Sequence, residues 1–326
     1  MRFFHKGNFS IWLGLVIGIL YGAAVRLIFT HSRFVEVFVV MSLGFIFVMP
    51  LTLGVLTVYF GARERSRGWL YLAFMPWVPC LVLLGAVAIL GWEGSICIIM
   101  ALPVFLVMST IGGLFTGLVL YSAKWEKHTY SLLAVFIALP FIVGSIEKRI
   151  ATPQSVRTAE TQIVIDAAPA VVWQNIERVR EIKPDEQRFS LVHLLGFPRP
   201  VEATLTHEGV GGVRHATFAG GVLFVETIDR WDQDKELSFA IKADTKSIPP
   251  TTLDEHVTVG GPYFDVLEGT YRIERLNGRQ VVLHLSSKHR LSTRFNFYAG
   301  LWTDFIMRDI QRNILQIIKR RCEVGP

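Results

Sequence analysis

Five polar residues in the second half of the chain could do chemistry: His215, Glu226, His256, Asp265 and His284. Both His215 and His284 lie in strand-like runs, Glu226 is flanked by apolar residues in LFVETID, and His256 and Asp265 bracket a long insertion. Histidine titrates near neutral pH and can act as a general acid or base beside an apolar substrate. Alternation along a strand sends about half of its residues to solvent, so each lone histidine also fits a purely structural place.

The known catalytic and metal-binding patterns are missing from the sequence. It has no Gly-x-Ser-x-Gly nucleophile turn, no P-loop and no Gly-x-Gly-x-x-Gly dinucleotide turn. The histidines lack metal-ligand spacing, and the cysteines (Cys80, Cys97 and Cys322) form no disulfide framework. We therefore expect no metal and no cofactor, assign no catalytic residue, and favour a non-enzymatic role.

The composition of the first half predicts that it lies in a membrane. The 326 residues are 51% hydrophobic and 18% charged, with a mean hydropathy of +0.41, which is too apolar for an ordinary soluble protein. Five apolar segments each approach the length of about 20 residues that crosses a bilayer. The sequence predicts an all-α bundle of about five spans within residues 1–147, at about 9–29, 35–60, 69–91, 95–121 and 129–146.

The first of these segments has an alternative interpretation. Arg2 and Lys6 precede its apolar run and the small residues Gly22, Ala23 and Ala24 follow, as in a cleaved signal peptide. Four further spans favour a retained helix. No ionisable residue lies in the middle of a span, which argues against an ion pathway or a transporter.

The excess of positive charge belongs entirely to the first half. The formal net charge is +6; residues 1–150 hold 11 Lys/Arg and 5 Asp/Glu, and residues 151–326 hold 22 of each. A neutral second half argues against nucleic-acid binding. With five spans, seven basic residues lie on the side of the N-terminus and four on the other. The positive-inside rule then predicts a cytosolic N-terminus and an extracytoplasmic second half, at a bacterial inner or plasma membrane. One span more or fewer would reverse the side of the second half.

A glycine stripe marks the first predicted span. Gly14, Gly18 and Gly22 recur at every fourth residue, a spacing that lets helices approach closely. The stripe predicts packing within one bundle or, alternatively, the contact of a homo-oligomer.

The second half reads as an α+β domain at 159–322, joined by a linker at 148–158. A strand-like run (TAETQIVIDA) and a helical one (APAVVWQNIERV) open it, and an amphipathic helix over 297–321 closes it. Six strand-like runs lie between them, at about 201–208, 213–219, 222–231, 235–243, 264–275 and 280–290. This order predicts a mostly antiparallel sheet with the long helix against one face.

The helical pattern also assigns faces to that last helix. The apolar face is predicted to hold Phe297, Leu301, Trp302, Phe305, Ile306, Ile310, Ile314, Ile317 and Ile318. The polar face is predicted to hold Asp304, Arg308, Gln311, Arg312 and Gln316. Lys319, Arg320 and Arg321 close the helix, either as a solvated end or as a contact for anionic lipid headgroups.

These elements resemble a known superfamily. The opening IVIDAAPAVVWQNI, the strand series and the long terminal helix are similar to the START-like, or SRPBCC, helix-grip fold, which includes polyketide cyclase/dehydrase and lipid-transport members. The resemblance covers about residues 158–321. It implies a cavity between the sheet and the last helix, which adds Trp302 and Phe305 to the candidate lining residues. No characterised catalytic motif maps onto this sequence, so the resemblance assigns no catalytic residue.

Three functions remain open from the sequence. The first is a membrane-anchored binding protein that holds a hydrophobic small molecule or a lipid, with membrane lipids as neighbours. The second is a cyclase- or dehydratase-like enzyme that uses His215, Glu226 or His284 as acid or base. The third is an interaction or sensing module whose cavity is filled by side chains.

Overall fold

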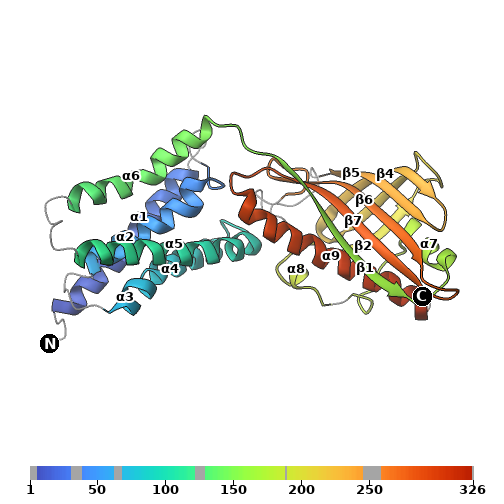
Figure 1. The fold of residues 1–326 in the computed structure, drawn as a ribbon, viewed down its shortest axis with the longest axis horizontal. Coiled ribbons are helices and arrows are strands. Elements are labelled where there is room, and N and C mark those ends of the chain that lie inside the picture. The colour runs from blue at the N-terminus through green and yellow to red at the C-terminus, as the bar shows by residue number, and fades with distance from the viewer. Residues whose placement is uncertain are drawn as a thin grey trace. The chain divides into compact units, whose positions relative to one another are not determined.

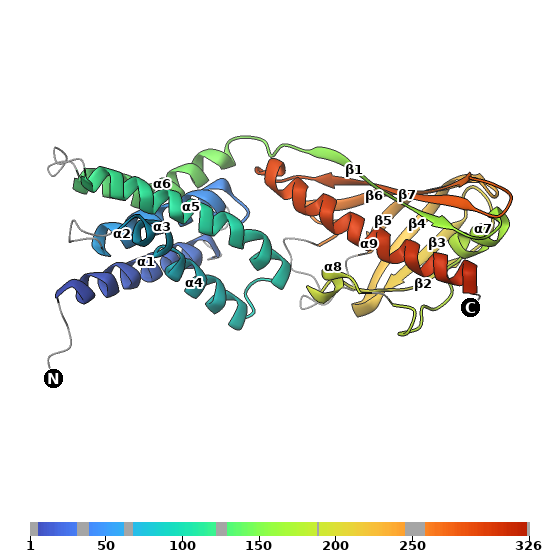
Figure 2. The ribbon, with the colours of Figure 1, turned by 60° about the horizontal axis from the view of Figure 1, so that its bottom comes forward.

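The computed structural model describes residues 6–30, 39–61, 68–121, 129–187, 189–244 and 258–324. The chain divides into two compact units, Met1–Thr152 and Pro153–Pro326, and the division falls inside the linker predicted at 148–158. Figure 1 and Figure 2 show both units, and each is described by itself.

The first unit is all helical. Its elements are α1 (Lys6–Thr30), the π-helical turn η1 (Gly44–Val48), α2 (Met49–Gly61), α3 (Trp69–Phe74), α4 (Trp77–Ile89), α5 (Ser95–Tyr121) and α6 (Thr129–Lys148). Five stretches in the described residues are helical, long and apolar enough to cross a membrane: Phe9–Thr30, Gly44–Gly61, Trp69–Ile89, Ser95–Tyr121 and Tyr130–Lys148. The five helical segments predicted from the sequence are confirmed. That they cross a membrane stays a prediction.

Polar contacts gather several helix ends at one end of this bundle. Arg26 Nη2, near the end of α1, lies 2.6 Å from Glu93 Oε1 in the turn between α4 and α5. The carboxylate of Glu147, near the end of α6, accepts hydrogen bonds from the backbone N–H groups of Leu43 and Gly44 at 2.9 Å each. The ring of Phe29 lies 5.5 Å from that of Phe45, which places the end of α1 beside the start of η1. The ends of α1, α4 and α6 therefore meet, as five alternating helical passes require.

The glycine stripe on α1 packs inside the bundle. A side chain at Gly14 or Gly18 would collide with Thr57 of α2, and one at Gly22 would collide with Leu83 of α4. The stripe therefore packs within one bundle, which is the first of its two predicted roles. Self-association of the chain stays a prediction.

Close contacts of this kind between helices predict that a larger residue at Gly54 of α2 destabilises the bundle. A Cβ at Gly54 would strike the backbone oxygen of Ser109 in α5, whereas a Cβ at Gly85 in α4 would meet nothing within 4 Å. We expect Gly54→Ala to destabilise the bundle by about 1–3 kcal/mol because the helices must separate. Gly85→Ala should be neutral or stabilise by up to about 1 kcal/mol through helix propensity. Thermal unfolding of the purified chain in detergent, followed by circular dichroism, measures both; equal effects would contradict the packing.

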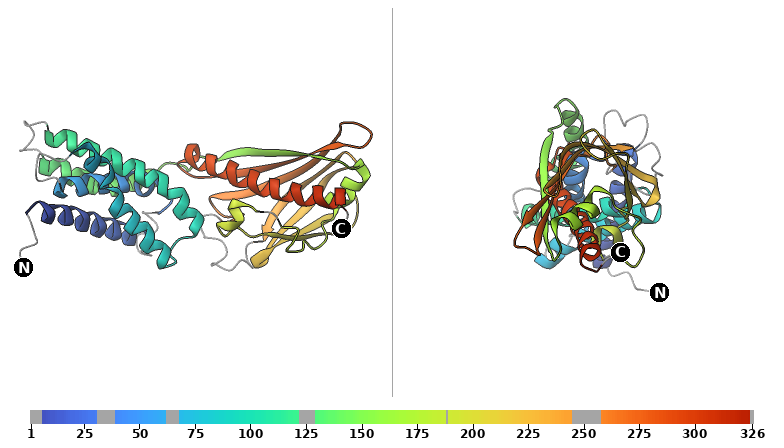
Figure 3. Two further views of the ribbon diagram at one scale, coloured as in Figure 1. Left: turned by 90° about the horizontal axis from the view of Figure 1, so that it is seen from below. Right: turned by 90° about the vertical axis from the view of Figure 1, so that its right-hand side faces the viewer.

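The second unit is a seven-stranded antiparallel sheet with a long helix. The strands are β1 (Ser155–Ile165), β2 (Pro200–Leu205), β3 (Val213–Phe218), β4 (Val222–Asp232), β5 (Glu236–Asp244), β6 (Phe264–Arg275) and β7 (Val281–Leu291), in the order β1-β7-β6-β5-β4-β3-β2. The helices are α7 (Pro169–Glu177), α8 (Leu191–Leu194) and α9 (Asn296–Val324), with a short 3-10 turn, η2 (Ala219–Gly221). The sheet curves around α9 (Figure 3), which confirms the α+β helix-grip arrangement.

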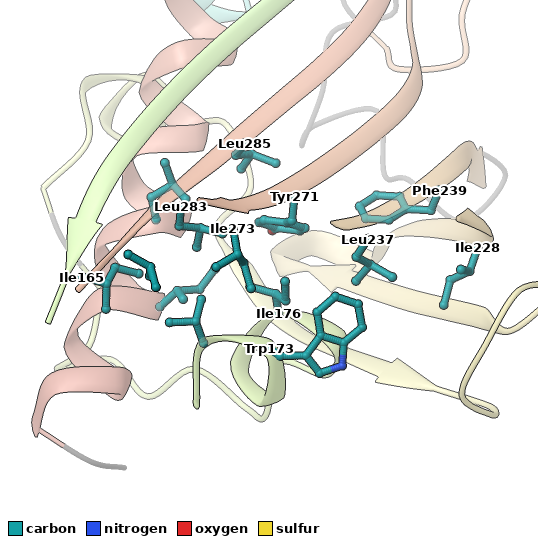
Figure 4. Close-up of a cluster of buried hydrophobic side chains, with 14 residues drawn as sticks. Ile165, Trp173, Ile176, Ile228, Leu237, Phe239, Tyr271, Ile273, Leu283 and Leu285 are labelled. Carbon is teal, nitrogen blue, oxygen red and sulfur yellow. The ribbon is translucent and has the colours of Figure 1, made fainter. Parts of the chain in front are cut away.

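The core of this unit lies between the concave face of the sheet, α7 and α9. Alternate residues of each strand point into it, as the period of two requires. Figure 4 shows the cluster, in which Trp173 and Ile176 of α7 meet side chains from five strands, among them Leu237, Tyr271 and Leu283. Leu315 and Ile318 contribute from α9.

The predicted face of α9 is wrong in its first half. Phe297 and Leu301, expected in the core, are 71% and 67% exposed, whereas Gln311, expected at the surface, is 2% exposed. The reason is a polar attachment to the sheet. Gln311 Nε2 donates to Ala159 O (3.1 Å) and Ser287 Oγ (2.9 Å), and the Asp304 carboxylate binds the Arg157 guanidinium through two bonds of 2.9 and 2.6 Å.

Candidate functional site

A cavity of about 70 Å³ lies between the sheet and the second half of α9. It is partly open to solvent, and most of its lining is apolar. The apolar residues come from β2, β3, α9 and the segment 179–187, which we call the wall segment: Val179, Ile182, Pro200, Ala203, Ala216, Phe218, Ile314, Ile317 and Ile318. The polar residues are Glu202, Arg214, Thr217, Glu226 and Tyr271.

One side of the cavity is a buried ion pair. Arg214 on β3 stands directly opposite Glu226 on β4, and Arg214 Nη1 lies 3.1 Å from Glu226 Oε2. The two side chains are only 4% and 7% exposed. The guanidinium also lies over the rings of Phe239 and Tyr271, at 5.2 and 5.8 Å from their centroids. These cation–π contacts partly replace the water that Arg214 loses on burial.

The hydrogen bonds of this pair are incomplete. Arg214 Nη1 and Glu226 Oε2 face each other within hydrogen-bond distance but are poorly aligned for a hydrogen bond, and Arg214 Nε meets no hydrogen-bond partner among the described residues. A buried pair recovers its desolvation cost only when its polar atoms are satisfied, so this one is a poor device for stability alone. The pair places two charged groups in a cavity whose lining is otherwise mainly apolar.

Burial also tunes the acid–base properties of the site. It raises the pKa of the Glu226 carboxyl above its ordinary value, and the nearby Arg214 charge opposes that rise without cancelling it. Burial likewise raises the pKa of the Tyr271 phenol, which therefore stays a neutral hydroxyl at physiological pH. The site can thus offer a cation, a carboxyl that takes up a proton readily, and a hydroxyl.

An ion pair and several hydrogen bonds join the wall segment to the end of α9. Arg321 Nε and Nη2 lie 2.6 and 2.8 Å from the two carboxylate oxygens of Glu186, and this ion pair lowers the pKa of Glu186 to about 2. Arg321 also donates to the backbone oxygens of Arg180 and Glu181. On its other side, Val179 exchanges two backbone hydrogen bonds with Ala203 of β2.

The basic cluster at the end of α9 is therefore used within the molecule. Besides Arg321, Lys319 Nζ donates to Val164 O at 2.7 Å and Arg320 Nη1 donates to Asp185 O at 2.7 Å. Lys319 and Arg320 stay partly exposed, so the solvated end and the lipid contact both remain predictions. Arg320 and Arg321 hold the wall segment, and Lys319 holds β1.

Of the seven residues that the sequence suggested for the site, the structure brings Glu226 to this cavity. His215 follows the inward-facing Arg214 on β3, so its side chain points to the other face of the sheet. His284 also lies on that face, with its Nε2 3.2 Å from Glu274 Oε2 and its Nδ1 3.5 Å from Glu160 Oε1.

Three further candidates, Asp265, Trp302 and Phe305, do not line the cavity either. Asp265 stands opposite Arg290 on β7. Trp302 and Phe305 pack edge to face on the first half of α9, with ring centroids 6.5 Å apart. His256 lies outside the described residues. Among those residues, no group of three His, Cys, Asp or Glu side chains is placed to hold a metal ion.

Arg214 and Tyr271 line the cavity but are not among the residues that the sequence suggested. A signal for Arg214 was present, because Arg214 and Glu226 are equally distant from Gly220, the centre of the turn between β3 and β4. A hairpin closed at that glycine pairs Arg214 with Glu226 and turns His215 away, since one residue of register changes the face. Tyr271 carried no comparable signal; its place depends on the pairing of β6 with both neighbouring strands.

Comparison with known proteins leaves the function open. No family model and no curated protein matches the chain. The START superfamily protein from Mycobacterium smegmatis is 7% identical, with 51% of this chain and 96% of that chain covered and a TM-score of 0.33. Norcoclaurine synthase from Thalictrum flavum, in complex with dopamine and hydroxybenzaldehyde, is 12% identical, with 51% and 86% covered and a TM-score of 0.31. The Aha1 dimer from Colwellia psychrerythraea is 14% identical, with 52% and 98% covered and a TM-score of 0.28. The helix-grip arrangement follows from the sheet order and from the packing of α9, not from these scores.

The buried pair gives a prediction with a definite pH dependence. Arg214→Met leaves Glu226 buried without its cation, and we expect a loss of about 3–5 kcal/mol in mildly alkaline buffer. Burial keeps the folded-state pKa of Glu226 above its unfolded value. The stability that the Glu226 carboxyl contributes is therefore fully present below its pKa in the unfolded chain. It is lost as the pH rises through its pKa in the folded protein.

The matched control removes both charges. Arg214→Met combined with Glu226→Leu should be close to wild type in stability, with no pH dependence from this position, because no buried charge is left unpaired. Chemical unfolding of the purified chain, followed by tryptophan fluorescence in mildly acidic and mildly alkaline buffer, compares the two variants. A single variant as stable as the double variant in alkaline buffer would contradict the burial of Glu226.

Proposed function

We propose that this chain is a membrane-anchored binding protein whose second unit holds a small, mainly apolar molecule that carries one polar group. The observation that supports this is the cavity beside α9, in which apolar side chains face a single buried pair, Arg214 and Glu226. Binding sites for small molecules commonly combine such an apolar lining with a few polar groups that orient the ligand.

The size of the cavity limits what it buries. An apolar cavity of about 150 Å³ is enough to bind benzene, whereas this one measures about 70 Å³. It therefore takes a group of a few heavy atoms, while the rest of the ligand lies at the open side. A whole lipid requires the wall segment to move, but the end of a lipid or a small amphipathic molecule does not.

The first unit supplies the anchor in this proposal. Its five helices are long and apolar enough to cross a membrane, and β1 begins seven residues after α6 ends at Lys148. A tether this short keeps the cavity near ligand dissolved in the membrane and raises its effective concentration. In this proposal, the charge asymmetry of the sequence favours a cytosolic N-terminus and a second unit outside, at a bacterial inner or plasma membrane.

Filling the cavity should abolish binding. Ala216 is buried and lines the cavity, whereas Ala240 on β5 is exposed. We expect Ala216→Leu to reduce co-purifying small molecules by about tenfold or more, a loss of about 1.4 kcal/mol per factor of ten, and Ala240→Leu to leave them unchanged. Mass spectrometry of extracts from both purified variants measures this. Equal retention by the two would exclude the cavity as the binding site.

Glu226 favours a second candidate function, an acid–base enzyme. Its carboxyl is buried in the cavity, its pKa is raised, and its Oε2 lies 3.1 Å from Arg214 Nη1 in a contact that is poorly aligned for a hydrogen bond. Such a carboxyl can transfer a proton to or from a substrate.

Substitution of this carboxyl separates binding from catalysis. Glu226→Gln keeps the shape of the side chain and cannot transfer a proton. For the binding protein we expect the extracted molecule to return unchanged after incubation with either wild type or Glu226→Gln. Conversion by wild type alone, with retention of the molecule by both, would favour the enzyme. Absence of any retained molecule in wild type would favour an interaction module instead.

A further inference from the structure

An apolar stripe is exposed on the first half of α9. Phe297, Leu301 and Phe305 follow one another at four-residue spacing and are 71%, 67% and 39% exposed. This spacing sets them in a row along one face of the helix, about 12 Å long at 1.5 Å per residue. Single exposed apolar residues need no explanation, but a contiguous row of them indicates a binding surface.

The stripe is held outward by the packing of the opposite face. Ala299 and Thr303 are buried against the sheet, and Asp304 is bound to Arg157 of β1. Rotation of α9 to cover the stripe would break that ion pair and bury the carboxylate alone. The second unit cannot cover Leu301 without that loss.

Few residues separate the start of the stripe from the last apolar helix along the chain. Asn296 Nδ2, one residue before Phe297, donates a hydrogen bond to Pro153 O at 3.0 Å. Pro153 follows the end of α6, at Lys148, by five residues. Five extended residues reach at most about 18 Å. Under the proposed anchoring, a tether of this length would keep the start of α9 near the bilayer.

We infer that the apolar stripe docks into the surface of the bilayer that the first unit spans. Phenylalanine and leucine on one face of a helix enter the boundary between headgroups and acyl chains, typically by about 5–10 Å. Exposed Arg308 on α9, together with Lys148 and Arg149 at the end of the last span, provides cations for anionic headgroups. The inference rests on the proposed membrane anchoring and is independent of what the cavity binds.

A spin label on the full chain tests this inference. The native cysteines Cys80, Cys97 and Cys322 are first replaced, and Leu301→Cys is labelled in nanodiscs of phosphatidylcholine and phosphatidylglycerol. Matched single-label controls are Ile111→Cys in α5, 47% exposed, and Leu276→Cys after β6, 52% exposed. Leu276 lies at the opposite end of β7 from α9. Phe297→Cys gives a second label in the stripe, should the variant at Leu301 fold poorly.

Accessibility to oxygen and to a water-soluble nickel chelate distinguishes the outcomes. We expect the labels at Leu301 and Ile111 to collide mainly with oxygen, and the label at Leu276 mainly with the chelate. A Leu301 label as open to the chelate as that at Leu276 would overturn docking while the Ile111 label still shows anchoring. A label shielded from both reagents would mean that protein, such as a second copy, covers the stripe, which also overturns it. A water-exposed label at Ile111 would overturn the anchoring and the docking together.

Discussion

The rotation of α9 about its own axis decides which side chains of this helix are buried and which are exposed. Hydrophobic side chains alone would turn Phe297 and Leu301 toward the sheet. Instead, Asp304 binds Arg157 and Gln311 binds Ala159 and Ser287, so polar groups of α9 face the sheet. Breaking the buried bonds of Gln311 would leave an amide unsatisfied in the core at a cost of about 1–3 kcal/mol. That cost offsets much of what burial of one apolar side chain of the stripe would gain. The same rotation directs Ile314, Ile317 and Ile318 into the cavity.

The cavity is a second place where charged side chains occupy buried positions. Arg214 and Glu226 occupy inward positions on β3 and β4 that apolar residues would fill at lower cost. The rings of Phe239 and Tyr271 reduce the cost for Arg214. Arg214 Nε still meets no hydrogen-bond partner among the described residues, and the contact of Nη1 with Glu226 is poorly aligned. Strained or unsatisfied groups of this kind are expected where a protein binds something. The imperfect pair, rather than the volume of the cavity, is what supports the proposal of a ligand.

Most of the architecture could be predicted from the sequence, because it depends on local periodicity. The five apolar helices, the order of the strands along the chain and the long final helix all follow from patterns with a period of two or 3.6 residues. The faces of α9 could not be predicted, since its apolar pattern is interrupted by Ala299, Gly300 and Thr303, which pack closely against the sheet although they are small. The site was half predictable. Glu226 was found from its apolar neighbours, and Arg214 was available from the register of the turn at Gly220, whereas Tyr271 depended on tertiary pairing alone.

The two halves of α9 place a limit on the ligand. Leu301 and Ile314 are separated by about 20 Å along the helix at 1.5 Å per residue, and they face opposite ways, one toward solvent and the other into the cavity. Under the inferred docking, α9 would lie between the lipid and the cavity. A ligand taken from the membrane would then pass through water or over the wall segment before it meets Arg214. A molecule with one polar group can make that passage and then satisfy the buried pair, whereas a purely apolar one gains nothing from Arg214 and Glu226. The geometry of α9 and the chemistry of the cavity thus favour the same class of amphipathic ligand.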